Sequence, residues 1–539
     1  MSLSLLSRYA FFAFCVIFTL ASLPFMHHEW LWPFTAVTLA LSLLGIFDLL
    51  QGPHAVRRNY PILGNIRYLV EAIRPEIRQY LLESDSDALP FSRAQRSLVY
   101  SRAKNETADK PFGTLIDVYE PGFEFIGHSM RPAPLTDPSS FRITIGGPQC
   151  TQPYSASIFN ISAMSFGSLS ANAIRALNKG AKLGNFAHDT GEGSISAYHR
   201  ENGGDLTWEL GSGYFGCRTS DGRFDPERFA AQAQTPQVRM IEIKMSQGAK
   251  PGHGGILPKH KVTPEIAETR GVPMGEDCIS PSRHSAFSTP IEMMHFIAQL
   301  RELSGGKPVG FKFCLGHPWE FMGICKAMLE TGILPDFIVI DGKEGGTGAA
   351  PVEFTDHMGA PMREGLLFVH NTLVGLNLRD KIKLGASGKI VSAFDIASVL
   401  AIGADWANSA RGFMFAIGCI QSQSCHTNKC PTGVATQDPL RQRALVVPDK
   451  AQRVFQFHTN TLKALAEMLA AAGLEHPAQL NAKHLVRRIS RTEIKLFSQL
   501  HVFLKPGELL TGEANGEFYS RMWQMARADS FEPDVIAAA

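Results

Sequence analysis

Three cysteines with the spacing C-x5-C-x4-C, Cys419, Cys425 and Cys430, lie in one loop flanked by glycine and serine. Thiolates are soft ligands that favour iron–sulfur clusters, zinc or copper(I). A three-iron cluster needs three thiolates, whereas a closed zinc site needs a fourth ligand, which His426 supplies only at strained spacing. Pro431 after the last cysteine is typical of cluster-binding runs. The spacing therefore favours a cluster held by all three cysteines over three buried free thiols.

The residues around this loop extend the pattern. The loop reads GC-x5-CHTNKCPTGVATQDP, and the segments SAMSFGSLS, DTGEGS, IEIKMSQGAKPGHGGILPKHKVT and IDGKEGGTGAAP precede it in that order. Together they resemble the FMN-binding synthase domain of glutamate synthases over about residues 123–440. The resemblance implies FMN and a [3Fe-4S] cluster as cofactors, with the three cysteines as cluster ligands.

Short apolar runs alternate with helical patterns between residues 150 and 440, which favours an α/β fold of the (β/α)8 TIM-barrel type. No G-x-G-x-x-G follows a strand as a dinucleotide-binding unit requires. In a TIM barrel, the loops after the strands form the active site. The expected strands are 157–166, 240–245, 309–315, 336–342, 381–388 and 405–412, and the expected helices include 170–184, 290–303 and 393–403.

The first 54 residues differ from the rest, because 9–26 and 31–50 are almost wholly apolar and each is long enough to cross ~30 Å of hydrocarbon. We predict a transmembrane hairpin. The alternative is a signal peptide, but no clear small-residue cleavage site follows the first stretch and a second stretch does. Arginines concentrate after the second stretch, which predicts a two-span protein of the cell inner membrane with its catalytic domain in the cytoplasm. These are Arg57, Arg58, Arg67 and Arg74.

Residues 55–122 form a basic connector in which 67–84 have apolar residues at helical spacing, interrupted by Pro75. This helix is expected either to lie on anionic lipid or to pack, solvated, on the main domain. Residues 441–539 form a helical region, with helices expected over 451–474 and 484–500.

Composition narrows the classes of function. The 539 residues are 45% hydrophobic and 19% charged, as in ordinary globular proteins. The net charge of +2 gives no reason to propose a nucleic-acid partner. Nine scattered cysteines indicate a reducing compartment rather than a disulfide framework.

Glycine-rich turns after two adjacent predicted strands are suited to a phosphate, since glycine lets backbone N–H groups approach an anion at a helix N-terminus. Tight turns without a ligand are the alternative. The candidates are Gly385, Ser387 and Gly388 after one strand, and Gly403, Arg411 and Gly412 around the next. The resemblance places Met164, Ser165 and Gly167 against the flavin ring. It also places Lys312 near N1 and O2 of the flavin, where a fixed charge stabilises the reduced ring, although a strand-end surface lysine would look the same.

The segment after the strand at 240–245 is polar and glycine-rich, and its Lys244 and Gln247 could hydrogen-bond the flavin or the substrate. By resemblance, Lys250 and Arg270 hold 2-oxoglutarate, which needs two cationic anchors, and Glu192 stands near an iminium intermediate. Each of these charges alone would usually be a solvated surface group.

Two departures from the family concern nitrogen and substrate. The chain has His253 and Ile256 in GHGGILP where glutamate synthases have glutamate and glutamine in GEGGQLP, which removes an amide that helps to bind 2-oxoglutarate. Glutamate synthases also use an N-terminal cysteine to release ammonia from glutamine. Here Cys15 lies within an apolar stretch, so we expect no glutaminase on this chain and ammonia supplied externally.

The sequence thus predicts reductive amination of 2-oxoglutarate, or a related keto acid, to glutamate. The expected partners are a keto acid, ammonia or an amine, membrane lipid, and a ferredoxin-like or NAD(P)H-dehydrogenase electron donor; a homo-oligomer is compatible with the sequence. A first alternative is a membrane-linked flavin dehydrogenase of another small amino or hydroxy acid, which Ile256 and the hairpin favour. A second is a non-catalytic redox-sensing or scaffold protein.

Overall fold

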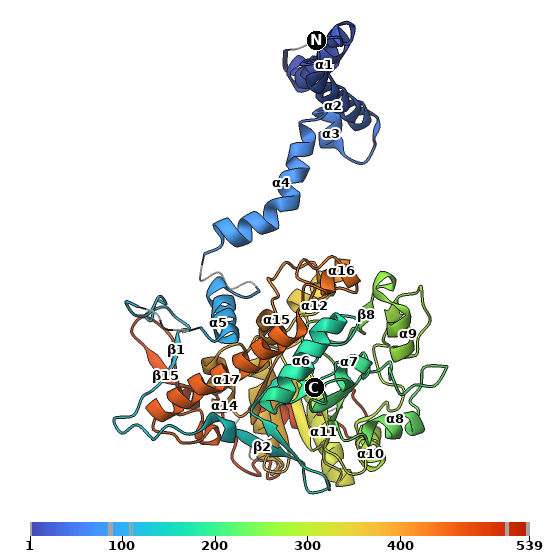
Figure 1. The fold of residues 1–539 in the computed structure, drawn as a ribbon. Coiled ribbons are helices and arrows are strands. Elements are labelled where there is room, and N and C mark those ends of the chain that lie inside the picture. Colours follow the sequence, from blue (N-terminus) through green and yellow to red (C-terminus); the bar gives the residue numbers. More distant parts are fainter. Residues whose placement is uncertain (1–2, 85–89, 107–108, 110, 513–516, 535–539) are drawn as a thin grey trace. The chain divides into compact units, whose positions relative to one another are not determined.

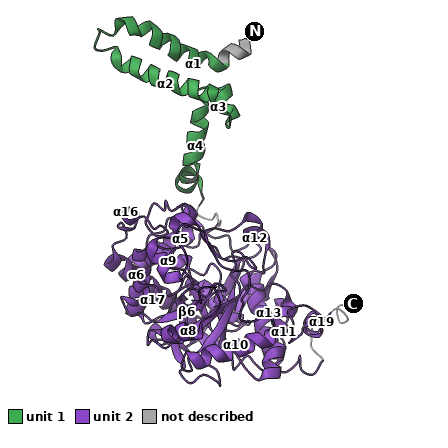
Figure 2. Cartoon of the chain, turned by 90° about the vertical axis from the view of Figure 1, so that its right-hand side faces the viewer, with its two compact units in different colours: residues 1–87 green, residues 88–539 purple. Residues whose placement is uncertain are grey.

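The computed structural model describes residues 3–84, 90–106, 109, 111–512 and 517–534. The chain divides into two compact units, residues 1–87 and 88–539 (Figure 2). The expected connector, 55–122, contributes to both units.

Helices are the only regular secondary structure in the described part of the first unit. Helices α1 (Leu3–Ser22) and α2 (Trp32–Leu50) lie side by side, followed by α3 (Ala55–Asn59) and α4 (Gly64–Ile77) (Figure 1). Helix α4 runs through Pro75 and continues as a π-helical turn, Arg78–Leu82. Hydroxyl groups join the first two helices: Thr19 Oγ1 donates to Thr38 Oγ1 (2.9 Å), and Thr35 Oγ1 donates to Ser22 Oγ (2.9 Å). The predicted helical hairpin is confirmed, since the two helices pack side by side. Both helices are long and apolar enough to cross a membrane, but their place in a membrane stays a prediction.

Eight parallel strands of the second unit close into a barrel, as predicted. They are β4 (Phe159–Ile161), β5 (His188–Asp189), β6 (Leu206–Leu210), β7 (Val238–Lys244), β10 (Val309–Phe313), β11 (Phe337–Asp341), β12 (Lys383–Ser387) and β13 (Trp406–Ser409). The six predicted segments each supply one of these strands. The prediction missed β5 and β6, because β5 has only two residues and β6 interrupts its apolar run with Thr207 and Glu209.

Helices surround the barrel and begin at capping residues visible in the sequence. Ser170 Oγ accepts from the Ala173 N–H at the start of α6 (Ala171–Gly184), and Asn185 ends that helix in the left-handed conformation. Thr289 and Glu292 form a capping box at α10 (Pro290–Leu303). These two predicted helices are confirmed, as is α14 (Ala393–Ala401).

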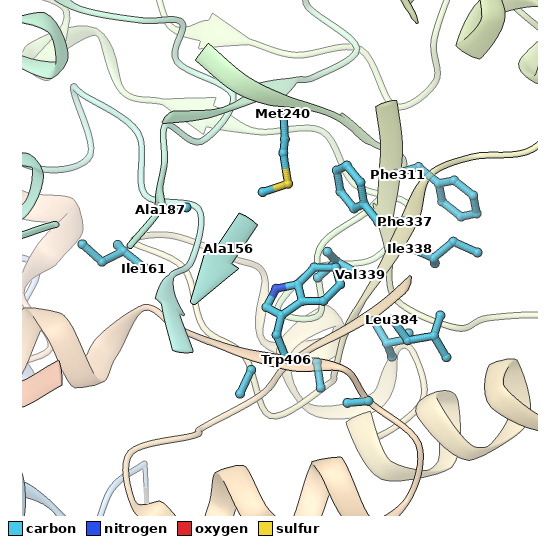
Figure 3. Packing of buried hydrophobic residues seen from close by; sticks show 14 of the residues in the cluster. Ala156, Ile161, Ala187, Met240, Phe311, Phe337, Ile338, Val339, Leu384 and Trp406 are labelled. Atoms are coloured by element: carbon cyan, nitrogen blue, oxygen red, sulfur yellow. The ribbon is translucent and has the colours of Figure 1, made fainter. Parts of the chain in front are cut away.

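Large apolar side chains fill the barrel near the amino ends of its strands (Figure 3). Trp406 and Phe337, the first residues of β13 and β11, lie with their ring centroids 6.0 Å apart at an interplanar angle of 66°. Gly385 on β12 makes room for Trp406, because a Cβ there would lie 2.4 Å from the indole ring. Met240 projects from β7 into the same layer (Figure 3). With this end packed, the opposite ends of the strands remain for a ligand.

The C-terminal region contains one long helix, α17 (Val447–Ala471), which packs on α6 and on α5 (Arg93–Lys104). The predicted helix over 484–500 is wrong. Strands β14 (Leu485–Arg488) and β15 (Ile494–Leu496) form a hairpin there, and only α18 (Phe497–Leu500) is helical. The reason is tertiary: β14 pairs antiparallel with β1 (Glu124–Ile126), so a partner strand far away in the sequence overrides the local helical spacing.

Candidate active site

A cavity opens at the carboxyl ends of the barrel strands. The last residues of four strands line it, namely Lys244, Asp341, Ser387 and Ser409. Most predicted site residues meet at this cavity: Met164, Ser165, Glu192, Lys244, Gln247, Lys250, Arg270, Lys312, Ser387, Gly388, Arg411, Gly412 and Cys425. This is the end at which TIM-barrel enzymes place their active sites.

Three predicted glycines lie elsewhere. Gly385 is inside the barrel wall under Trp406, as described above, and Gly403 lies before β13, at the end opposite the cavity, where a Cβ would meet the His370 ring at 2.4 Å. Gly167, with φ +101°, lies beside Arg270 and Leu257, and its carbonyl accepts a hydrogen bond from Gln437 Nε2 (3.0 Å). The structure gives each of them a packing or turn role.

Lys312 lies at the floor of the cavity, fully buried among carboxylates. Its ammonium donates to Glu209 and lies 3.2 Å from Glu242, while the oxygens of Asp189, Glu209 and Glu242 lie within 4.8 Å of one another. Burial alone would lower the pKa of Lys312, but Glu209 and Glu242 hold this pKa well above its ordinary value. The lysine is therefore a fixed cation, and it supplies the positive charge that this acidic cluster requires.

Sequence reasoning missed these three carboxylates. Burial raises the pKa of Asp189 well above its ordinary value, and Glu242 raises it further. Burial also raises the pKa of Glu242 to about 7, against the opposing effect of Lys312. The available signal was an acidic residue inside an otherwise apolar strand, in LTWEL and VRMIEIK. Such a residue is retained only where its charge has a partner or its proton stays bound.

The acidic cluster predicts a pH dependence of stability. The pKa of Glu242 rises from 4.5 to about 7 on folding, so the folded chain retains a proton that the unfolded chain releases. The contribution of Glu242 to the free energy of unfolding is therefore fully present below about pH 4.5 and is lost as the pH rises through about 7. Between these values the free energy of unfolding falls by at most about 1.4 kcal/mol per pH unit. In thermal unfolding followed at several pH values, Glu242→Gln is expected to flatten this slope. The same change at Glu201, which pairs with Arg175 at the surface, is expected to leave the slope intact; an unchanged slope in Glu242→Gln would contradict the assignment.

Glu192 and Lys244 form an ion pair at the cavity wall, with Nζ and Oε2 3.2 Å apart, and Ser280 Oγ donates to the same carboxylate (3.1 Å). Burial by itself raises the pKa of Glu192, but Lys244 and Arg270 hold this pKa below its ordinary value. Gly255 lets the backbone pass, since a Cβ there would lie 1.9 Å from Glu192 Oε1. The site thus holds an ionised carboxylate at neutral pH.

Arg270 and Lys250 are both buried but differ in their contacts. Arg270 Nη2 donates to the Phe166 carbonyl (2.9 Å), and its guanidinium lies 5.2 Å from the Phe215 ring centroid. Among the described residues, no acceptor contacts the ammonium of Lys250, and burial lowers the pKa of this lysine. Ile256, on β8 (Ile256–Leu257), faces the same cavity with 39% of its surface exposed. The cavity therefore combines a free cation with an apolar wall.

A second pair of cations lines the far side of the cavity. Lys389 Nζ and the Arg411 guanidinium lie 5.8 and 5.9 Å from the ring centroid of Phe91. Burial lowers the pKa of both groups, and no hydrogen-bond acceptor for either side chain lies among the described residues. Gly346 permits this placement, because a Cβ there would clash with Arg411. Two unpaired cations beside Ser387 and Gly388 form a site for an anion.

The cysteine loop borders this anion site. Cys425 lines the cavity, and burial together with the thiols of Cys425 and Cys430 raises the pKa of Cys419 to about 12. Burial would also raise the pKa of Cys430, but backbone N–H groups, first that of Ala435, hold this pKa below its ordinary value. Arg411 lies close enough to Cys419 and Cys425 to affect their pKa. Burial and the neighbouring thiol of Cys430 likewise raise the pKa of Cys425, so of the three grouped thiols only Cys430 favours the thiolate by itself.

Residues from distant parts of the chain hold the loop in shape. The Phe91 N–H donates to Gln421 Oε1 and the Phe91 carbonyl accepts from Gln421 Nε2, both at 3.2 Å, while Tyr100 Oη donates to the Cys419 carbonyl (2.7 Å). Lys261 Nζ donates to the carbonyls of Ser168 (3.1 Å) and Cys425 (3.4 Å). Gln421, Gln423 and Asn428 all have positive φ. A loop that holds three such residues is fixed by its surroundings rather than by local preference.

Comparison with known proteins identifies the family of this chain. The family model for the conserved region in glutamate synthase matches residues 145–475, more than half of the chain. The chain belongs to the glutamate synthase family. The resemblance inferred from the cysteine loop and the glycine-rich segments is thereby confirmed.

Other family members differ in how much of their length the chain covers. The glutamate synthase large subunit-like protein YerD of Bacillus subtilis is 37% identical over 500 residues, which is 85% of this chain and 95% of YerD. The archaeal-type glutamate synthase [NADPH] of Thermotoga neapolitana is 33% identical over 313 residues, 58% of each chain. Among solved structures, a mutant flavocytochrome b2 with pyruvate bound aligns with 84% of this chain and 91% of its own at a TM-score of 0.41 and 12% identity.

Proposed function

We propose that this member of the glutamate synthase family is a membrane-tethered oxidoreductase that uses FMN and a [3Fe-4S] cluster. One observation carries the proposal: the buried Lys312, the cation pair Lys389 and Arg411, and Cys425 of the cysteine loop all line a single cavity. When bound, FMN would supply two-electron transfer to or from a substrate, and the cluster would supply single electrons.

The residues present suit FMN. Lys389 and Arg411, with the backbone at Ser387 and Gly388, would hold the phosphate, because these cations have no other acceptor among the described residues. Met164 and Ser165, from the loop after β4, would contact the ring. Lys312 would place a permanent positive charge at the floor, which favours an anionic reduced ring.

The cysteine loop suits a cluster with three thiolate ligands, Cys419, Cys425 and Cys430. Backbone N–H groups directed at Cys430, and the nearby charges of Arg411 and Lys261, stabilise anionic sulfur. A closed zinc site would need a fourth ligand. Among the described residues, the only three His, Cys, Asp or Glu side chains whose ligand atoms all lie within 4.8 Å of one another are those of the acidic cluster at Lys312. The three cysteine sulfurs are therefore spaced more widely than that.

For the substrate, we propose a 2-oxo acid whose carboxylate is bound by Lys250 and Arg270. Glu192, ionised and paired with Lys244, would attract an ammonium or iminium nitrogen. The reaction that fits is reductive amination of 2-oxoglutarate, or a related keto acid, to an amino acid with ammonia supplied externally. Electrons would come from a ferredoxin-like or NAD(P)H-dehydrogenase partner, in keeping with the NADPH in the names of several relatives.

The exposed side chain of Ile256 favours a second candidate. An apolar wall opposite the cations suits a substrate with an apolar substituent, so oxidation of another small amino or hydroxy acid is the alternative reaction. For location, we propose that α1 and α2 cross the inner membrane and that the barrel is cytoplasmic.

The direct test uses the anaerobically purified full chain. Visible and EPR spectra are expected to show a flavin and an iron–sulfur cluster. With 15N-ammonium, 2-oxoglutarate and reduced ferredoxin or an NADPH-linked donor, mass spectrometry should detect labelled glutamate. Bleaching of the flavin by an amino or hydroxy acid, without glutamate formation, would instead establish the second candidate. Colourless, iron-free protein would contradict both.

Lys250 gives a sharper prediction about the substrate. Lys250→Met removes a buried cation with no other acceptor, and charge-assisted hydrogen bonds contribute about 1.5–3 kcal/mol. We therefore expect KM for the keto acid to rise about 10- to 100-fold, with a smaller change in kcat. Lys259→Met, at an exposed lysine nine positions on, is the matched control and should change neither constant. An unchanged KM in Lys250→Met would remove this lysine from the binding site.

A further inference from the structure

Helix α4 exposes a continuous row of apolar side chains. Ile66, Leu69, Val70 and Ile73 recur at intervals of three and four residues, so they share one face of the helix. These four side chains, the apolar stripe, are 56%, 62%, 49% and 43% exposed. Isolated exposed apolar residues are ordinary, but a continuous row of four marks an interaction surface.

Arginines follow one flank of the apolar stripe. Arg67, Arg74 and Arg78 come at helical spacing beside it and are all exposed. Arg67 pairs with Glu71 at 3.0 Å, an exposed contact of small energetic value. A partner for this face must therefore offer both apolar material and negative charge.

The other side of α4 is attached to the helical hairpin. The Tyr68 ring lies 5.0 Å from the His54 ring and 4.3 Å below the Arg57 guanidinium. Asn65 Nδ2 and the Ile62 N–H donate to Asp48 Oδ2 at 2.6 and 3.0 Å, which fixes the start of α4 to the end of α2. Asn65 thus contacts α2, and Tyr68 contacts His54 and the α3 residue Arg57, while the apolar stripe stays uncovered.

The direction of α4 identifies what covers the stripe. Figure 2 shows α4 leaving the end of the paired helices α1 and α2 in a direction transverse to them rather than continuing along them. If the hairpin crosses a bilayer, a helix that leaves its end in this direction runs along the membrane surface. There, apolar side chains reach the acyl boundary while arginines meet phosphate groups.

We propose that α4 is an interfacial helix whose apolar stripe is embedded in the headgroup layer of anionic phospholipid, on the side of the membrane from which the hairpin emerges. This rests on the proposed membrane hairpin. The lipid surface adds a second attachment beside the two spans and fixes the first segment after them.

Site-specific photocrosslinking of the full chain in nanodiscs tests the proposal. A benzophenone amino acid replaces Leu69 in the stripe, Glu71 on the charged face, or Leu43 of α2, which is 59% exposed in the hairpin. The nanodiscs contain phosphatidylglycerol and phosphatidylcholine, and mass spectrometry identifies the adducts. We expect lipid adducts at position 69 at a level several-fold above position 71, together with lipid adducts at position 43.

The other outcomes separate the explanations. Lipid adducts at position 43, with crosslinks to protein or none at position 69, would overturn the interfacial helix and leave the hairpin standing. No lipid adducts at position 43 would overturn the membrane hairpin, and the interfacial helix with it.

A second measurement tests the charge. Replacement of Arg67, Arg74 and Arg78 by glutamine should reduce the excess of phosphatidylglycerol over phosphatidylcholine adducts at position 69 several-fold. Adducts at position 43 should not change, because that side chain contacts acyl chains. An unaltered lipid preference would show that the arginines do not select anionic headgroups.

Discussion

Cys425→Ser is expected to yield a protein that retains its flavin and loses its iron–sulfur cluster. Serine keeps the size of the side chain but removes the thiolate, and a cluster with three ligands has none to spare. Loss of a group that only hydrogen-bonds a metal ligand typically lowers metal affinity or activity 10- to 100-fold. Loss of a ligand itself should cost more, so we expect turnover with a one-electron donor to fall by more than about 100-fold. Iron analysis and the EPR signal of the oxidised cluster measure the loss directly.

The matched control is Cys150→Ser. Cys150 is half-buried, lies outside the loop, and donates to the Gly306 carbonyl at 3.3 Å, a bond that a serine hydroxyl can replace. This variant should retain iron, flavin and turnover. Two results would contradict the cluster: full iron content in Cys425→Ser, or one zinc ion and no iron in the unaltered protein.

The fold was predictable wherever a strand or helix is decided by its own residues. Six barrel strands are apolar runs bounded by glycine or charged residues. Helix α6 has capping residues at both ends, Ser170 at its start and Asn185 at its end. Strand β6 was not predicted because Glu209, which lines the polar cavity, breaks its apolar pattern. The hairpin β14–β15 was not predicted because its partner strand, β1, lies some hundreds of residues earlier in the sequence.

The site was predictable in its cations and less so in its anions. Lysine and arginine near the carboxyl ends of strands and in the segments after them are recognisable candidates, and Lys250, Lys312 and Arg411 do converge on one cavity. Gly385 and Gly403 were predicted to bind phosphate because the sequence does not distinguish a glycine needed for packing from one needed to approach a ligand. Phe91 lies near two cations and hydrogen-bonds Gln421 of the cysteine loop, which is 330 residues further along the chain. No local sequence pattern could therefore indicate its place in the site.

The largest effect on both stability and chemistry is expected for Lys312→Met. Removing the ammonium leaves Glu209, Glu242 and Asp189 buried without a cation, and breaking a buried ion pair in this way costs about 3–5 kcal/mol. Part of that cost is avoided if the carboxylates take up protons. We expect a lower unfolding temperature and, because the positive charge at the floor of the cavity is lost, a fall in turnover of about 100-fold or more.

A companion variant separates the two roles of this lysine. In Lys312→Met/Glu209→Gln, one carboxylate is neutralised together with the ammonium, so the charge imbalance largely disappears and the unfolding temperature should recover toward that of the unaltered protein. Turnover should not recover, and the midpoint potential of the flavin should remain lower than in the unaltered protein, since no cation then stabilises an anionic reduced ring. Lys312→Arg, which keeps the charge, should retain more of that potential than either variant. Recovery of turnover together with stability in the double variant would show that Lys312 acts only as a counter-ion for the carboxylates beneath the site.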